Sequence, residues 1–394
     1  MNFSILALLV AVGLAGPLLA TVPRLGAPLV IGEIAAGVVI GRSGLGLVPV
    51  DDPALTLLSD LGFALLMLIV GTHLPLRRPA LRPALGRAVL ATVATAGIAA
   101  ASGLALAPVT GLHRPALLAV LLASSSGAVA LPVLQSLPDD GAPGLLVTTA
   151  WVALLDVGTV LAIPLVVPQG SLRSVLAGIL AVGALAATVY LVARRSAGHP
   201  WTARVRHRSR TGHWALDLRV SLVVLFVLAA VATRQHTSVL IAGFAAGGVL
   251  ALLGEPRRLA EQLIGLGEGF LVPIFFVTLG ARLQLSGLLQ QPRNLVLAGV
   301  LAVGATVVHT AVAVAVRLPV GAGLLATAQL GVPAAVASLG LTTGLLSPGQ
   351  GAAVLAASLL SLAACSVGAH LLGHRNRIGD HTALPLRRDH ANPT

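Results

Sequence analysis

Residues 115–137 read PALLAVLLASSSGAVALPVLQSL, an apolar stretch of membrane-spanning length that is interrupted near its middle. The interruption consists of Ser124-Ser125-Ser126-Gly127 and Pro132. Glycine and proline free backbone groups from helical hydrogen bonds, and within a bilayer such breaks are tolerated only where they are buried or line a watery cavity. A second apolar stretch, 319–346, is interrupted in the same way by Gly331-Val332-Pro333. We therefore expect two broken helices inside a membrane.

The composition of the whole chain agrees with a membrane protein. Of its 394 residues, 56% are hydrophobic and only 10% are charged, and the mean hydropathy is +0.96. A soluble domain carries about 25% charged residues. Aromatic residues are 3% of the chain, so its apolar mass is alanine, leucine, valine and glycine, which suit close helix packing in lipid. The expected fold class is an all-α polytopic membrane protein.

Thirteen apolar segments are long enough to cross a bilayer, which takes about 20 residues. They lie at 2–22, 27–48, 54–74, 85–108, 115–137, 144–167, 172–193, 214–233, 237–254, 263–283, 293–316, 319–346 and 350–373. Residues 1–373 would form the membrane domain, and residues 374–394 a short cytoplasmic tail.

The basic residues predict the orientation of these spans. All 25 basic residues are arginine, and with the N-terminus outside, 19 of them fall on the inner side and 6 on the outer side. Cytoplasmic loops of membrane proteins are enriched in arginine, so we expect an N-out, C-in protein of a bacterial inner membrane. The basic excess is explained by topology and not by binding of nucleic acid. The Arg-rich loop 194–210 is interpreted as a topogenic loop, with contact to anionic lipid as the alternative.

Three sequence patterns recur seven spans apart. The segments Ile31–Gly37 and Ile241–Gly247 resemble each other, Gly62-Phe63 matches Gly269-Phe270, and the two interrupted spans form the third pair. Seven is an odd number, so matched spans cross the membrane in opposite senses, as in the inverted repeats of secondary transporters. We predict two six-helix repeats, about 2–167 and 214–373, with 172–193 as the connecting helix. The two broken helices would then cross near the midplane.

Asp156 is the principal candidate site residue. It lies well inside the span 144–167, in a segment without another charge. Burial favours the neutral, protonated form over the charged carboxylate, so a proton and a metal cation can compete for this group, and exchange of one for the other follows from that competition. The hydroxyls of Ser124, Ser125 and Ser126 would add hard oxygen ligands for an alkali cation. The alternatives are a structural aspartate that caps a broken helix, and serines that serve helix packing.

Four further ionisable residues lie at or near membrane depth. Glu33, Glu268 and His309 could carry protons, or could be structural groups that pair with their neighbours. Arg282 closes the tenth span, where it could snorkel or pair with an acid. Functional and structural roles both stay open for this set.

Other classes of function find little support. The sequence has no phosphate-binding loop, no dinucleotide motif, no Cys/His metal cluster and no nucleophile triad on a soluble scaffold. We therefore expect a transporter that is not an enzyme and needs no cofactor. Two alternatives are an ion-coupled transporter of a small organic solute and a non-transporting membrane sensor or partner subunit.

Four segments in this order resemble the monovalent cation:proton antiporter superfamily, in particular its bacterial sodium/proton and potassium/proton exchangers. They are Gly32–Gly41 (GEIAAGVVIG), Leu65–Gly71 (LLMLIVG), Ser124–Leu134 (SSSGAVALPVL) and Pro273–Gly280 (PIFFVTLG). The resemblance covers about residues 5–373.

The resemblance implies a homodimeric, thirteen-helix antiporter in which a core domain moves against a dimerisation domain. The ion-binding aspartate of the family falls on Asp156. Where relatives carry Asn or Asp before that residue, this chain has Leu155, and a single carboxylate implies electroneutral exchange. His309 stands near the place of a lysine in many relatives. We expect spans 3 to 6 and 10 to 13 to form the moving core.

Overall fold

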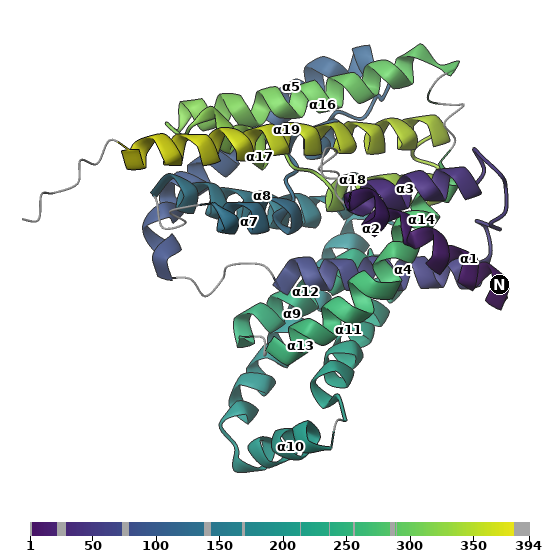
Figure 1. The fold of residues 1–394 in the computed structure, drawn as a ribbon, viewed down its shortest axis with the longest axis vertical. Helices are drawn as coiled ribbons and strands as arrows, with labels where there is room; N and C mark the ends of the chain where they lie inside the picture. Colours follow the sequence, from purple (N-terminus) through teal and green to yellow (C-terminus); the bar gives the residue numbers. More distant parts are fainter. Residues whose placement is uncertain are drawn as a thin grey trace, which may run out of the picture.

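All regular elements that the structure describes are helices. The computed structural model describes residues 2–21, 29–72, 79–137, 143–167, 170–212, 214–235, 237–254, 257–283, 288 and 290–381. The helices pack into two groups, which we name the broken-helix bundle and the flanking bundle. In Figure 1 the first occupies the upper part of the molecule, while α9 (Leu172–Ala197) and α11 (Leu216–Arg234) of the second run down to α10 (Pro200–Thr211).

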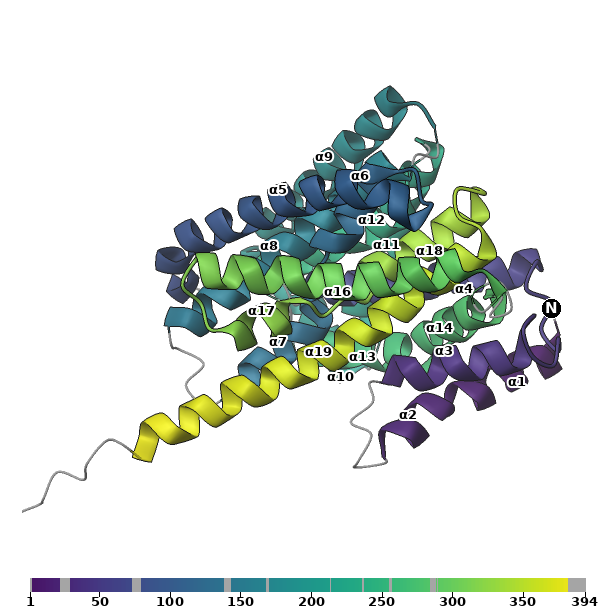
Figure 2. The same ribbon diagram turned by 90° about the horizontal axis from the view of Figure 1, so that it is seen from above.

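The broken-helix bundle contains both interrupted spans. Its members are η1 (Pro79–Ala84), α5 (Leu85–Thr110), α6 (Pro115–Ala123), α7 (Gly127–Ser136), α8 (Pro143–Val166), α16 (Pro292–Ala315), α17 (Val320–Ala326), α18 (Gly331–Thr342) and α19 (Pro348–His381). The long helix α19 packs against α16, α17 and α18 and then extends beyond the rest of the bundle (Figure 2).

The flanking bundle is built from the remaining spans. Its members are α1 (Phe3–Gly13), α2 (Ala15–Ala20), α3 (Leu29–Ile40), α4 (Pro53–Thr72), α9 (Leu172–Ala197), α11 (Leu216–Arg234), α12 (Val239–Leu253), α13 (Arg257–Leu266), a π-helical turn η2 (Gly267–Leu271) and α14 (Val272–Arg282). A short helix, α10 (Pro200–Thr211), joins α9 to α11 within the stretch predicted as an Arg-rich loop.

The predicted spans are all present as helices in the described part of the chain. Eleven segments are long and apolar enough to cross a membrane, and α3 and α12 are two shorter apolar helices. Together they match the thirteen predicted segments. The expected fold class, an all-helical polytopic membrane protein, is confirmed.

Two boundaries differ from the prediction. The second span was expected to reach residue 48, but α3 ends at Ile40, and the chain turns through Gly41 to Gly46, which has a left-handed φ of 64°. The backbone N–H of Arg42 donates to the carbonyl of Ala281 at 3.0 Å, so this turn is held against the end of α14. At the other end, α19 continues past residue 373 to His381, into the segment expected to be a tail. Residues 382–394 lie outside the described residues.

The expected grouping of the spans needs a correction. Spans 3 and 10, at 54–74 and 263–283, were expected to join the broken helices, but α4 packs on α12 and α14 packs on α3. The physical reason is the glycine spacing in α3 and α12. A side chain at Gly37 would overlap the backbone of Val277, and one at Gly247 would overlap the carbonyl of Leu68. Only glycine allows these helix backbones to approach so closely, so α4 and α14 belong to the flanking bundle.

The packing is reciprocal between the two predicted repeats. Span 2 (α3) lies on span 10 (α14), and span 9 (α12) lies on span 3 (α4), the same pairing with the repeats exchanged. The two broken spans also meet each other. Reciprocal contacts of this kind are expected between two inverted repeats. The same relation brings one interruption from each repeat into the broken-helix bundle.

Candidate functional site

Each interrupted span consists of two short helices separated by a few residues that are not helical. In the first, α6 ends at Ala123 and α7 begins at Gly127, with Ser124 and Ser126 in extended conformations. In the second, α17 ends at Ala326 and α18 begins at Gly331. The C-terminal carbonyls of one half-helix and the N-terminal amides of the next are therefore without helical partners, and other groups must satisfy them.

Several of these backbone carbonyls and amides find partners because the two breaks form hydrogen bonds with each other. The backbone N–H of Ser126 donates to the carbonyl of Ala328 at 2.7 Å. The side-chain amide of Gln329 donates to the carbonyls of Leu121 at 2.9 Å and Ser124 at 3.1 Å, at the end of α6. The backbone N–H of Gln329 donates in turn to the Ser361 hydroxyl on α19 at 3.2 Å. The predicted meeting of two broken helices is thus a hydrogen-bonded junction.

Asp156 lies at this junction. Its side chain, 3% exposed, projects from the unbroken helix α8, and Oδ2 accepts the backbone N–H of Gly127 at 2.8 Å. Gly127 is the first residue of α7, so the carboxylate stands at the positive end of a half-helix, where a negative charge is stabilised. A Cβ at the Gly127 position would come within 2.8 Å of Oδ2, so any side chain there would force the carboxylate to shift. Gly127 is therefore part of the carboxylate site.

The three serines beside Asp156 are all buried but differ in their partners. The Ser124 hydroxyl donates to the Leu121 carbonyl at 3.0 Å. The Ser125 hydroxyl has no hydrogen-bond partner among the described residues, and Ser126 contributes its backbone N–H to the junction. A buried hydroxyl without a partner is costly unless something else binds it. Of the three, Ser125 therefore has the oxygen most available to a cation.

The prolines and the second glycine lie at different places relative to the breaks. Gly331 is the first residue of α18, and Pro333 is in its first turn, where a missing N–H costs nothing. Pro132, by contrast, lies inside α7, and the helix continues through it to Ser136. The expectation that Pro132 interrupts the span is therefore wrong, because the serines and Gly127 alone make the break.

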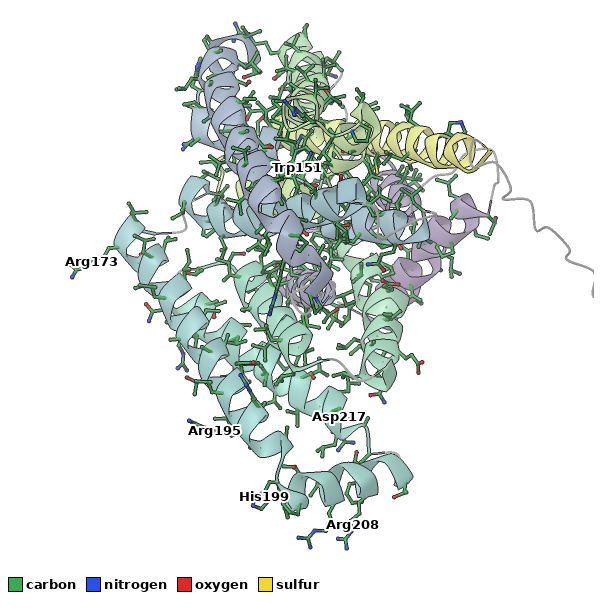
Figure 3. All side chains as sticks on the ribbon, turned by 90° about the vertical axis from the view of Figure 1, so that its left-hand side faces the viewer. Trp151, Arg173, Arg195, His199, Arg208 and Asp217 are labelled. Atoms are coloured by element: carbon green, nitrogen blue, oxygen red, sulfur yellow. The ribbon has the colours of Figure 1, made fainter. Side chains whose placement is uncertain are left out.

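His309 is fully buried on α16, next to α8. Its Nδ1 lies 2.8 Å from the carbonyl of Ala305, and its ring packs against Trp151 of α8 with ring centroids 5.8 Å apart. Trp151, labelled in Figure 3, donates its Nε1 to the Thr95 hydroxyl of α5 at 3.2 Å. Nε2 of His309 makes no hydrogen bond among the described residues. The histidine thus belongs to the packing that ties α16, α8 and α5 together.

The other ionisable candidates lie in the flanking bundle. Glu33, 5% exposed on α3, lies near enough to Glu268 on η2 for the two negative charges to repel each other. Arg282, at the end of α14, donates to the Thr56 hydroxyl at 2.8 Å and is attracted by Asp60 on α4. The structure thus places Glu33 near Glu268, and Arg282 near Asp60 and Thr56, all of them on helices of the flanking bundle.

Gln329 is the residue of the junction that sequence reasoning missed. It is 4% exposed and precedes Gly331 in an otherwise apolar stretch. A polar amide at membrane depth is a signal in its own right, since polar groups there are expensive. A polar side chain within an apolar span therefore indicated Gln329 as clearly as the three serines indicated the first break.

Two broken helices that meet at a buried carboxylate, inside a bundle of membrane-spanning helices, define a secondary transporter of ions. The family model described as "Sodium/hydrogen exchanger, transmembrane" matches residues 6–373, and the chain belongs to that family. The fold is also that of the sodium proton antiporter MjNhaP1 from Methanocaldococcus jannaschii, with a TM-score of 0.61 over 94% of this chain and 97% of that one, at 16% identity.

Curated relatives agree with the family. The chain is 28% identical to the putative Na⁺/H⁺ antiporter YjbQ of Bacillus subtilis over 301 residues, which are 70% of this chain and 46% of that protein. It is 27% identical to the Na⁺/H⁺ antiporter NhaS5 of Synechocystis over 68% of this chain and 38% of that protein. It is 29% identical to the glutathione-regulated potassium-efflux protein KefC of Shigella sonnei over 73% of this chain and 47% of that one. The chain thus spans less than half the length of these relatives.

Proposed function

We propose that this chain exchanges Na⁺ or K⁺ for protons, one cation for one proton, with Asp156 as the group that binds each in turn. Membership of the sodium/hydrogen exchanger family supports the substrate class. The observation that carries the site is the buried Asp156 carboxylate, which accepts the N–H of Gly127 at the start of α7. Two residues earlier in the chain, the Ser125 hydroxyl has no hydrogen-bond partner among the described residues. A carboxylate and hard oxygen ligands suit an alkali cation as well as a proton.

Electroneutral exchange follows from having one carboxylate at the junction. Asp156 with a proton is neutral, and Asp156 with a monovalent cation is also neutral, so the two loaded states carry the same charge. The empty carboxylate is a buried charge with one backbone N–H as its recorded partner, which makes it costly. Leu155, where relatives carry a second polar group, is 2% exposed and packs in an apolar cluster with Leu131. Either loaded form can therefore cross at lower cost than the empty one.

The arrangement of helices supports alternating access by movement of one bundle against the other. The broken-helix bundle holds Asp156 and both breaks, and it would move as a unit against the flanking bundle. The flanking bundle would also provide the contact between two copies in a homodimer. The bias of arginines to one side supports an N-out, C-in orientation in a bacterial inner membrane.

The test is transport by the purified protein in proteoliposomes. A pH-sensitive dye reports proton movement when Li⁺, Na⁺ or K⁺ is added, with and without an imposed membrane potential. We expect one or more cations to drive proton efflux at a rate that the potential does not change. Asp156→Asn should abolish that flux, because an amide cannot exchange a proton for a cation. The matched control is Asp52→Asn, since Asp52 caps α4 through the Ala54 N–H and asparagine caps equally well.

Three results separate the parts of this proposal. Full flux in correctly inserted Asp156→Asn would remove Asp156 from the mechanism. A rate that depends on the membrane potential would overturn the one-for-one exchange. Flux of none of the three cations by the wild-type protein would overturn cation exchange itself and favour a different solute.

A further inference from the structure

We propose that the end of the flanking bundle beneath α10 binds an anionic phospholipid, with an acyl chain in an apolar cavity and the headgroup on the surrounding arginines. The cavity has a volume of about 490 Å³ and is lined by residues of α9, α10, α11, α12 and α13. This site is separate from the junction at Asp156, and it does not depend on the exchange reaction proposed above.

The lining of the cavity suits a hydrocarbon chain. Aliphatic side chains are supplied by every helix around it, including Val189, Val205, Val220, Val249 and Leu259. The cavity lies where α9 ends and α11 begins, and both of these helices are membrane spans. An apolar cavity in that position opens at the level where acyl chains meet headgroups, and burial of a chain removes apolar surface from water.

The charge around the cavity is complementary to an anionic headgroup. Between residues 194 and 219 the sequence has seven arginines and one acidic residue, Asp217. Arg195 at the end of α9 and Arg208 on α10 are both exposed, and Figure 3 shows them on either side of the α9–α10 corner. Asp217 lines the cavity in the first turn of α11, so the headgroup would lie outside it, toward the arginines. A polybasic segment next to a span attracts anionic lipid.

Two tryptophans place this region at the membrane surface. Trp201, 61% exposed, begins α10 and lines the cavity, and Trp214, 51% exposed, follows α10. Exposed tryptophan is typical of the interface between bilayer and water. A basic helix flanked by tryptophans and lying over an apolar cavity combines the two signals, a buried chain and a polybasic patch, that together give stable lipid binding.

The experiment measures lipid binding to the full, detergent-purified chain by native mass spectrometry, with thermal unfolding as a second readout. Phosphatidylglycerol is compared with phosphatidylcholine and with soluble glycerol phosphate. We expect phosphatidylglycerol to bind and to raise the unfolding temperature, because a ligand that binds only the folded state stabilises it. Arg195→Gln with Arg208→Gln should weaken this binding roughly thirtyfold. Ala193→Trp, which places an indole in the cavity, should block it.

Matched controls lie on the same helices. Arg173→Gln with Arg234→Gln removes two exposed arginines from the opposite ends of α9 and α11, and Ala187→Trp adds an indole to an exposed position of α9 outside the cavity. These variants should bind phosphatidylglycerol as the wild type does. Equal binding of phosphatidylcholine, or equal losses in site and control variants, would overturn the headgroup assignment. Binding of glycerol phosphate as tight as that of the lipid, or undiminished lipid binding by Ala193→Trp, would overturn the role of the cavity.

Discussion

Replacing Gln329 by leucine should weaken the junction of the two broken helices by about 2–4 kcal/mol. Leucine has a similar volume, so the change removes hydrogen bonds without opening a large cavity. The Ser124 carbonyl then loses its recorded partner, and a buried acceptor left unsatisfied costs about 1–3 kcal/mol. The Leu121 carbonyl keeps the bond from the Ser124 hydroxyl, so its loss is nearer the ordinary 0.5–1.5 kcal/mol, about the net value of one hydrogen bond.

The assay is reversible unfolding of the purified protein in mixed micelles, followed by tryptophan fluorescence as denaturing detergent is added. Gln135→Leu is the control, because Gln135 is an exposed glutamine on α7. A third variant, Gln329→Glu, tests the direction of the bonds. The ionised carboxylate of this variant would face two carbonyl oxygens and repel them, whereas the protonated carboxyl can donate one hydrogen bond. The stability of the variant protein should therefore recover as the pH falls. If Gln329→Leu and Gln135→Leu unfold at the same point, the junction does not depend on Gln329.

Three further changes test other contacts. Gly127→Ala should reduce cation-driven proton flux by about tenfold or more, because its Cβ would displace the Asp156 carboxylate; unchanged flux in vesicles would contradict that geometry. Gly247→Ala should destabilise the protein by about 1–3 kcal/mol through overlap between α12 and α4, whereas Gly248→Ala has open space and should be neutral in the same unfolding assay. His309→Gln should leave flux within about twofold of wild type from pH 6 to 8, about the range in which histidine titrates; a changed pH profile would show that the ring titrates during transport.

The membrane spans were predictable because each depends only on local composition. Even the two short helices, α3 and α12, were found from apolar length and their shared pattern. The grouping of spans was not predictable from order along the chain. The grouping depends on which helix backbones can approach each other closely. Gly37 lies against the backbone of α14 and Gly247 against the backbone of α4, where a side chain would overlap. Those glycines can be read from the sequence, but the helices that they contact cannot.

The candidate site divides in the same way. Asp156 could be found because a lone carboxylate at membrane depth needs no partner to be conspicuous. The broken spans could be found from Ser124–Gly127 and Gly331, although Pro132 misled because a proline inside an apolar run is not always a helix end. The bonds of Gln329 could not be foreseen, since its acceptors lie 205 and 208 residues away along the chain. Only the fold brings them within reach.

In the exchange proposed above, Asp156 must face each side of the membrane in turn, and the bonds inside and between the two bundles bear on how it would do so. At the junction, Ser126, Gln329 and Ser361 hold both breaks and α19 through buried, directional hydrogen bonds, so one half-helix cannot move alone without breaking them. Between the bundles, one apolar cluster joins side chains such as Met67 on α4 and Val332 on α18, and apolar contacts have no preferred direction. Sliding along that surface costs less than opening the junction. We infer that the broken-helix bundle carries its carboxylate across as one rigid body.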